Sequence, residues 1–174
     1  NMRRIVTGHD GNGKSVVSID GPPARTINED AGGLYEIWNT DGGGFDTVAT
    51  DDRADTEIVL SPEKGGTKFR YFQINPLPEG ISPEDLEASA AIAFEKMGAS
   101  HHRVDTSKNP AMHQTETIDY IIVLKGDVTL VLDEEEVGLE PFDVVVQRGT
   151  NHAWVNNGSE PALLIAVLID SHLV

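Results

Sequence analysis

The chain has 174 residues, 39% of them hydrophobic and 24% charged, which is an ordinary composition for one globular domain with a buried core. Its formal net charge of −16 argues against nucleic acids and anionic membranes as partners, because both attract clustered Lys and Arg. The absence of cysteine excludes disulfides and thiolate chemistry. No run approaches the roughly 20 apolar residues of a membrane span, and no long apolar stretch follows the N-terminal arginines. We therefore expect a cytoplasmic protein without a signal peptide.

Short apolar or alternating runs, separated by turns rich in Gly, Asp, Asn and Pro, predict β-strands along most of the chain. The strands expected in the first half are residues 4–7, 15–19, 34–39, 57–60 and 68–74. Those expected in the second half are a strand that starts at His113 and residues 128–132, 141–147 and 162–169. Many short strands with frequent turns are typical of a sandwich or barrel.

One segment has the periodicity of a helix instead. Ser82 and Pro83 form a helix start, and acidic residues follow in the first turn. Apolar residues then recur at helical spacing up to Met97, and Gly98 can end the helix. We expect a helix over residues 83–97 that packs on the sheets or on a partner chain, or that covers the mouth of a barrel.

Two groups of polar residues stand out in the second half of the chain. His113 and Asp119 are six positions apart, and Gly126 follows seven positions later. Further on, His152 lies between a glycine and an asparagine in the segment Gly-Thr-Asn-His-Ala-Trp-Val-Asn. Two His and one carboxylate from separate segments are a metal-ligand set.

The first group resembles the first motif of the cupin superfamily. His113 takes the first His position of that motif, Asp119 takes the Glu position, and Gly126 takes the closing Gly position. Thr115 stands where the second His belongs. Three of the four metal-ligand positions of the family, counting one in the second motif, therefore carry a residue that can bind a metal.

The second group resembles the second cupin motif. Gly149, His152 and Asn156 match it, and Gln147 stands where Pro is usual. The resemblance covers residues 67–170. It implies an all-β, single-domain cupin over residues 1–174: N-terminal strands in residues 4–60, a jelly-roll β-barrel in residues 67–170, and one additional helix near residues 83–97.

The resemblance also implies that His113, Asp119 and His152 converge inside the barrel and bind one divalent transition metal, namely Fe, Mn, Zn, Ni or Cu. Along an ideal strand, His113 and Asp119 would be about 20 Å apart at about 3.3 Å per residue, so a bend around residues 114–117 is required. Alternatively, the three side chains form a hydrogen-bonded acid–base cluster without a metal. A third interpretation is that the histidines only pack in the core.

Four residues near these motifs are candidate substrate contacts. The hydroxyls of Thr115 and Thr117 could bond a substrate hydroxyl, and Trp154 could form an aromatic wall beside His152. Arg148 has the fork that binds a carboxylate or enolate, unless it faces solvent.

Two other features complete the expectations around the site. We expect Asn156 to fix its turn through backbone hydrogen bonds. The roles of the tandem pair His101 and His102 stay open between solvated loop residues and a cover for the barrel mouth.

Two classes of function fit these residues. The first is a metal-dependent enzyme acting on a small oxygenated carbonyl or carboxyl compound, by decarboxylation, dehydration or isomerisation, or by oxygenation if the metal is iron. The second is a small-molecule-binding protein without catalysis, which Thr115 in a ligand position favours; a metal-free acid–base enzyme is the remaining alternative. We further expect a homodimer formed through the strands of residues 4–19, because exposed sheet edges need cover.

Overall fold

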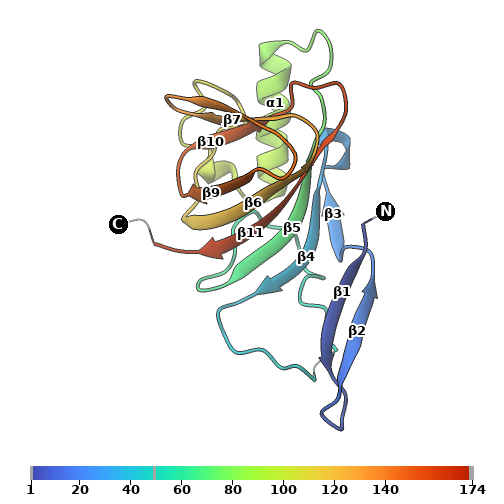
Figure 1. The fold of residues 1–174 in the computed structure, drawn as a ribbon. Coiled ribbons are helices and arrows are strands. Elements are labelled where there is room, and N and C mark those ends of the chain that lie inside the picture. The colour runs from blue at the N-terminus through green and yellow to red at the C-terminus, as the bar shows by residue number, and fades with distance from the viewer. Residues whose placement is uncertain (1, 49, 173–174) are drawn as a thin grey trace.

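The protein is described by a computed structural model that covers residues 2–48 and 50–172 (Figure 1). A six-stranded sheet contains, in spatial order, β3 (Arg25–Ile27), β4 (Leu34–Thr40), β5 (Thr67–Ile74), β11 (Ala162–Asp170), β6 (Thr117–Lys125) and β9 (Val144–Arg148). A three-stranded sheet contains β10 (His152–Val155), β7 (Val128–Leu132) and β8 (Glu136–Leu139). A separate hairpin is formed by β1 (Arg4–His9) and β2 (Ser15–Gly21).

The two larger sheets enclose the main core. Along β6 and β11, side chains alternate between buried and more exposed, as expected for strands with one face toward a core. Ile121 and Leu164 from the six-stranded sheet pack with Val128 of β7 and Trp154 of β10. This arrangement of two antiparallel sheets confirms the predicted all-β fold of jelly-roll type, and the strands among the described residues do not close into a complete barrel.

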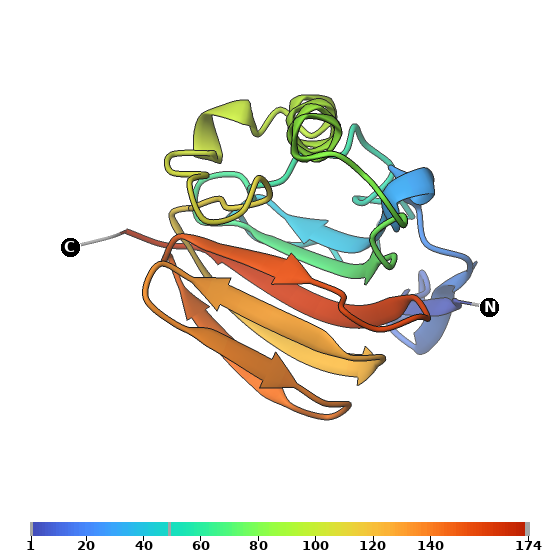
Figure 2. The ribbon, with the colours of Figure 1, turned by 90° about the horizontal axis from the view of Figure 1, so that it is seen from above.

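The helix α1 (Pro83–Lys96) lies over one side of the sheets (Figure 2). The Ser82 hydroxyl accepts a hydrogen bond from the backbone N–H of Asp85 at 3.1 Å, so the predicted N-terminal cap is present. The last turn directs Phe94 into the interior, where Phe94 and Met97 pack against Leu34 and Leu60. The prediction of a helix near residues 83–97 is therefore confirmed, and α1 covers the interior rather than standing apart from it. Two short 3-10 turns, Glu29–Ala31 and Ser100–His102, complete the helical content of the described residues.

Some predicted elements were wrong or incomplete. Residues 57–60 form no strand, because the carbonyls of Val59 and Leu60 accept hydrogen bonds from the Arg70 guanidinium instead of from a neighbouring strand. The strand expected over 141–147 begins only at Val144, since Phe142 has a positive φ of 77° in the preceding turn. Strands β3, β8 and β10 are short and were not predicted. None of the helices in residues 2–48 and 50–172 combines the length and apolarity needed to cross a membrane.

Candidate active site

The two motif histidines lie side by side. His113 precedes β6 and pairs with His152 at the start of β10 through an isolated antiparallel bridge, with N–H···O distances of 2.9 and 3.0 Å. Their ring centroids are 4.3 Å apart, and the rings are inclined by 49°. The chain therefore leaves the line of β6 before Thr117, which is the bend that the sequence spacing required.

The backbone fixes the tautomer of both imidazoles. Nδ1 of His113 lies 2.9 Å from the carbonyl oxygen of Ala111, and Nδ1 of His152 lies 2.9 Å from that of Thr150. Because a carbonyl oxygen can only accept a hydrogen bond, both Nδ1 atoms must carry the proton. In a neutral ring the lone pair is then on Nε2. Each imidazole thus presents an unprotonated nitrogen that can accept a proton, accept a hydrogen bond or bind a metal.

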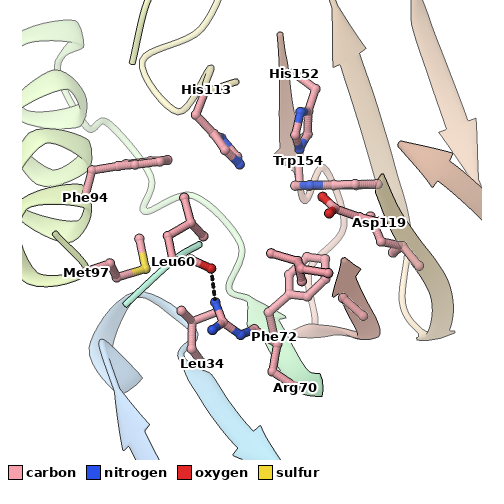
Figure 3. Close-up of a pocket in the computed structure, with 13 residues that line it drawn as sticks. Leu34, Leu60, Arg70, Phe72, Phe94, Met97, His113, Asp119, His152 and Trp154 are labelled. Atoms are coloured by element: carbon pink, nitrogen blue, oxygen red, sulfur yellow. Dashed lines mark hydrogen bonds between the residues drawn. The ribbon is translucent and has the colours of Figure 1, made fainter. Parts of the chain in front are cut away.

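The two imidazoles and Asp119 line one cavity of about 140 Å³, here called the inner cavity. Figure 3 shows His113, His152 and the Asp119 carboxyl group directed toward the same space from different segments. Most of the other lining is apolar: Leu34, Leu60, Phe72, Phe94, Met97, Ile121, Trp154, Ala166 and Leu168. The inner cavity is therefore a small apolar space with three groups capable of acid–base or ligand chemistry.

The aromatic walls hold the imidazoles in place. The ring centroids of Phe94 in α1 and His113 are 4.9 Å apart. Those of Trp154 and His152 are 5.7 Å apart, with the rings nearly edge-on. The Trp154 ring also packs against Phe72, with ring centroids 5.8 Å apart. The structure thus places Trp154 beside His152, where the sequence predicted an aromatic wall, and adds Phe94 as the wall beside His113.

Burial sets the protonation states of the site. It lowers the pKa of His113 to about 3, with a further lowering from the adjacent His152 ring, and it lowers the pKa of His152 to about 4. Burial raises the pKa of Asp119 to about 6, although the Thr117 hydroxyl and the Arg70 charge act in the opposite direction. Asp119 Oδ1 is buried and has no hydrogen-bond partner. At neutral pH the imidazoles are uncharged, whereas Asp119 can gain or lose its proton.

Arg70 lines the inner cavity and was missed by the sequence analysis. Its Nε lies 2.6 Å from Oε1 of Glu36, and both side chains are almost fully buried. Its two terminal nitrogens donate to the carbonyls of Val59 and Leu60 at 2.9 and 3.1 Å. Arg70 therefore fixes the loop that supplies Leu60 to the cavity wall. Strand alternation alone could have placed Arg70 on an inward face, but nothing in the sequence marked Glu36 as its partner.

Three of the predicted substrate contacts lie away from the inner cavity. Thr115 and Thr117 are buried with their hydroxyl oxygens 2.7 Å apart, but they line a second space of about 490 Å³, here called the outer cavity. Arg148 is exposed: it pairs with Ile118 in the β6–β9 register, whereas its neighbour Gln147 pairs with Asp119 and is buried. Because successive residues of a strand point to opposite faces, Arg148 faces solvent, and its predicted role at this site is corrected.

The other motif positions have structural roles. The Asn156 side chain donates to the carbonyls of Ile74 and Glu160 and accepts from the N–H of Gly158, all at 2.8 Å. This confirms that Asn156 fixes its turn. Gly126 has a φ of 87°, and a Cβ atom there would lie 2.7 Å from the Cα of Ala162. Only glycine fits at this position without displacing β11.

The donor chemistry of the inner cavity fits a divalent transition metal. Two neutral imidazoles with free Nε2 atoms and a carboxylate oxygen without a partner are ligands that such metals take. Hydrogen bonds from Nδ1 to backbone carbonyls usually orient metal-binding histidines. In the described part of the chain, however, no three His, Asp or Glu side chains are gathered into a metal-binding group. The two imidazoles are thus already side by side. The Asp119 carboxyl lines the same cavity but is not close enough to form a group of three ligands with them.

Comparison with known proteins identifies the family. Residues 101–168 match the cupin domain family. Over 173 residues the chain is 30% identical to the cupin-domain-containing oxidoreductase fogC of Aspergillus ruber, a match that covers 96% of this chain and 71% of that protein. This chain belongs to the cupin superfamily.

This cupin is also similar to the cupin-domain-containing oxidoreductase virC of Hypocrea virens, with 26% identity over 179 residues covering 96% of this chain and 75% of that protein. Among solved structures, it matches a Cupin 2 conserved barrel domain protein from Salinispora arenicola with 17% identity and a TM-score of 0.37. That match covers 60% of this chain and 63% of the other, slightly less than two thirds of its length. Because cupins host many chemistries, the reaction has to be argued from the site residues.

Proposed function

We propose that this cupin is an enzyme that acts on a small oxygenated carbonyl or carboxyl compound in the inner cavity. The observation that carries the proposal is the pair of neutral imidazoles, His113 and His152, together with the unpartnered Oδ1 of Asp119 inside a mostly apolar space. Burying a polar atom without a partner costs free energy, so the unpartnered Asp119 Oδ1 beside two imidazoles is more than a core needs for packing.

The three side chains divide the chemistry between them. A group with a pKa near the working pH is the most effective proton donor and acceptor, and the pKa of Asp119, about 6, meets that condition. The imidazoles resist protonation, so they suit hydrogen bonding or ligand binding through Nε2 better than proton storage. Without a bound metal, Asp119 is therefore the proposed acid–base group, and His113 and His152 are the proposed groups that orient the reacting oxygen.

We propose one divalent transition metal, namely Fe, Mn, Zn, Ni or Cu, as the cofactor. His113 and His152 would hold it through Nε2, and Asp119 would supply the carboxylate ligand of a 2-His-1-carboxylate site. When bound, such an ion polarises a substrate oxygen, and iron, manganese or copper can also exchange electrons. The aromatic walls formed by Phe94 and Trp154 would exclude water around these ligands.

The size of the inner cavity limits the substrate, and the names of similar proteins favour one class of reaction. A space of about 140 Å³ is comparable to an engineered cavity that binds benzene, so the reacting end of the substrate must be compact. Two similar proteins are named oxidoreductases. These names favour oxidation or oxygenation over decarboxylation, dehydration and isomerisation, which the residues alone leave equally open.

The proposal can be tested with metal-loaded protein and a panel of compact carbonyl and carboxyl compounds. We expect His113→Ala and His152→Ala to lose both metal and turnover while keeping the fold, and the exposed His172→Ala to keep both. Turnover that survives in both cavity variants would contradict the proposed function. Turnover that is unchanged by chelation but lost in Asp119→Asn would assign a metal-free acid–base enzyme. Ligand binding without turnover of any compound would assign a non-catalytic binding protein.

Residue 115, which departs from the cupin motif, offers a further test of the proposed metal site. Because Thr115 lines the outer cavity, Thr115→His should not tighten metal binding by the imidazole pair. A clear gain in metal affinity in this variant would show that residue 115 does reach the inner cavity.

A further inference from the structure

The outer cavity adjoins the inner cavity along the same strands. Thr117 and Asp119 are two residues apart on one face of β6; the first lines the outer cavity and the second the inner one. On β11, Leu168 likewise lines the inner cavity and Asp170 the outer one. Residues two apart on a strand are separated by roughly 7 Å. The two cavities therefore follow each other along the inner faces of these strands.

Two other segments separate the cavities with neighbouring side chains. Leu60 lines the inner cavity and Ser61 the outer one, while His113 lines the inner cavity and Gln114 the outer one. The partition between the cavities is thus about one layer of side chains thick. A single elongated ligand would reach both spaces only if side chains of this layer move aside, because Arg70 holds the backbone at Leu60 in place.

The outer cavity has a different chemistry from the inner one. Ser61 Oγ lies 2.8 Å from Nε2 of His102, and the His101 ring lies beside the His102 ring, with centroids 4.0 Å apart and planes inclined by 39°. Burial lowers the pKa of His102, and the adjacent His101 lowers it further, so both effects favour the neutral ring. This part of the lining offers a hydroxyl and an imidazole that can share hydrogen bonds with a ligand.

The carboxylates that line the outer cavity give it a negative charge. Glu116 and Asp170 line it, and no Lys or Arg does so among the residues that the structure describes. Asp170 Oδ2 already accepts from the N–H of Gly65 at 2.6 Å, whereas Glu116 is exposed and available. Such a lining attracts hydrogen-bond donors that carry positive charge and repels anions.

We propose that the outer cavity is a second substrate subsite, which binds a protonated amine on the polar end of the substrate while the compact reacting end occupies the inner cavity. The proposal deepens the proposed function and rests on it for the position of the reacting end. It assigns Glu116 and Asp170 as the charge partners of the amine. It also assigns the Ser61–His102 pair as a hydrogen-bonding contact, and so gives the tandem histidine segment a role in substrate selection. Substrates with a carboxylate at this end are disfavoured.

Three aryl probes that differ only in their polar end would test the subsite: benzylamine, benzyl alcohol and benzoate. Binding is followed by amide chemical-shift changes, which need no turnover. We expect the amine to bind most tightly and to shift the amides of Ser61, His102 and Glu116. In Glu116→Gln the amine should bind about threefold to fivefold more weakly, the size of one solvent-exposed charge pair. The matched control Glu134→Gln, on the exposed acidic turn, should leave amine binding unchanged.

Benzoate that binds as tightly as benzylamine and shifts the amides of Ser61, His102 and Glu116 equally would overturn the subsite. Benzylamine that binds equally in wild type and Glu116→Gln would also overturn it. Because the measurement is binding alone, its failure is separable from failure of the proposed function. Amine binding retained by protein that turns over no compound would contradict the enzyme proposal only. Turnover lost in His152→Ala without any amine preference would contradict the subsite only.

Discussion

The buried carboxyl of Asp119 should make the stability of this cupin depend on pH in a direction that can be worked out from its surroundings. Its pKa is about 6 in the folded protein against an ordinary value of 3.8. Between these values the folded chain holds a proton at Asp119 that the unfolded chain has released. The stabilisation by protonated Asp119 is therefore fully present below pH 3.8 and is lost as the pH rises through 6.

The size of the effect follows from the same two pKa values. A difference of about 2 units corresponds to roughly 3 kcal/mol, at about 1.4 kcal/mol for each unit. Asp119→Asn has nearly the same shape and cannot ionise, so it lacks this dependence. Relative to wild type, the variant should gain about 2.4 kcal/mol in unfolding free energy between pH 4 and pH 7, which is most of the full difference.

Urea unfolding at four pH values between 4 and 7, with a chelator present, measures this difference. Subtracting the two curves removes the contributions of the other carboxyl groups, which both proteins share. Glu134→Gln serves as the control for removing one negative charge from a chain of net charge −16. A difference between wild type and Asp119→Asn that stays constant within about 0.5 kcal/mol would refute the argument that burial raises the pKa of Asp119.

Three further predictions concern the framework of the site. Glu36→Gln should lower the unfolding free energy by about 3–5 kcal/mol, because it leaves the Arg70 charge buried without its partner; a loss below about 1 kcal/mol in urea unfolding would argue against that ion pair. Gly126→Ala should cost at least about 2 kcal/mol in the same assay, since its Cβ would meet Ala162, and an unchanged midpoint would show that β11 can move aside. The strands of residues 4–19 should form a homodimer, and light scattering that reports a strict monomer at tens of micromolar would reject that assembly.

The sequence predicted the features that depend on local pattern and motif spacing. The N-terminal cap of α1 at Ser82 and the turn held by Asn156 depend on residues within a few positions, and both are present. The convergence of His113, Asp119 and His152 on one cavity followed from the resemblance to the cupin motifs. The required bend was deduced from the distance that an extended strand would impose.

The parts that the sequence did not predict depend on partners far apart in the chain. Arg70 contacts Glu36 and the loop at residues 59–60, and this long-range pairing turned an expected strand into an irregular segment. Thr117 shares its face of β6 with Asp119, as alternation required, but it lines a different cavity further along that face. The alternation of side chains tells which face of a strand a residue lies on, but not which cavity lies beside it along the strand. Alternation therefore could not assign these residues to one cavity or the other.

The most direct test of the site is to observe the ring nitrogens of His113 and His152 by nitrogen-15 NMR, assigned with the single alanine variants. At pH 7 without metal, both rings should carry the proton on Nδ1 and leave Nε2 unprotonated, because each Nδ1 donates to a backbone carbonyl. Neither ring should become protonated between pH 7 and pH 5, and added divalent zinc should shift both Nε2 signals. A ring that carries its proton on Nε2, or that titrates near pH 6.5, would contradict the buried neutral imidazole pair on which the proposed function depends.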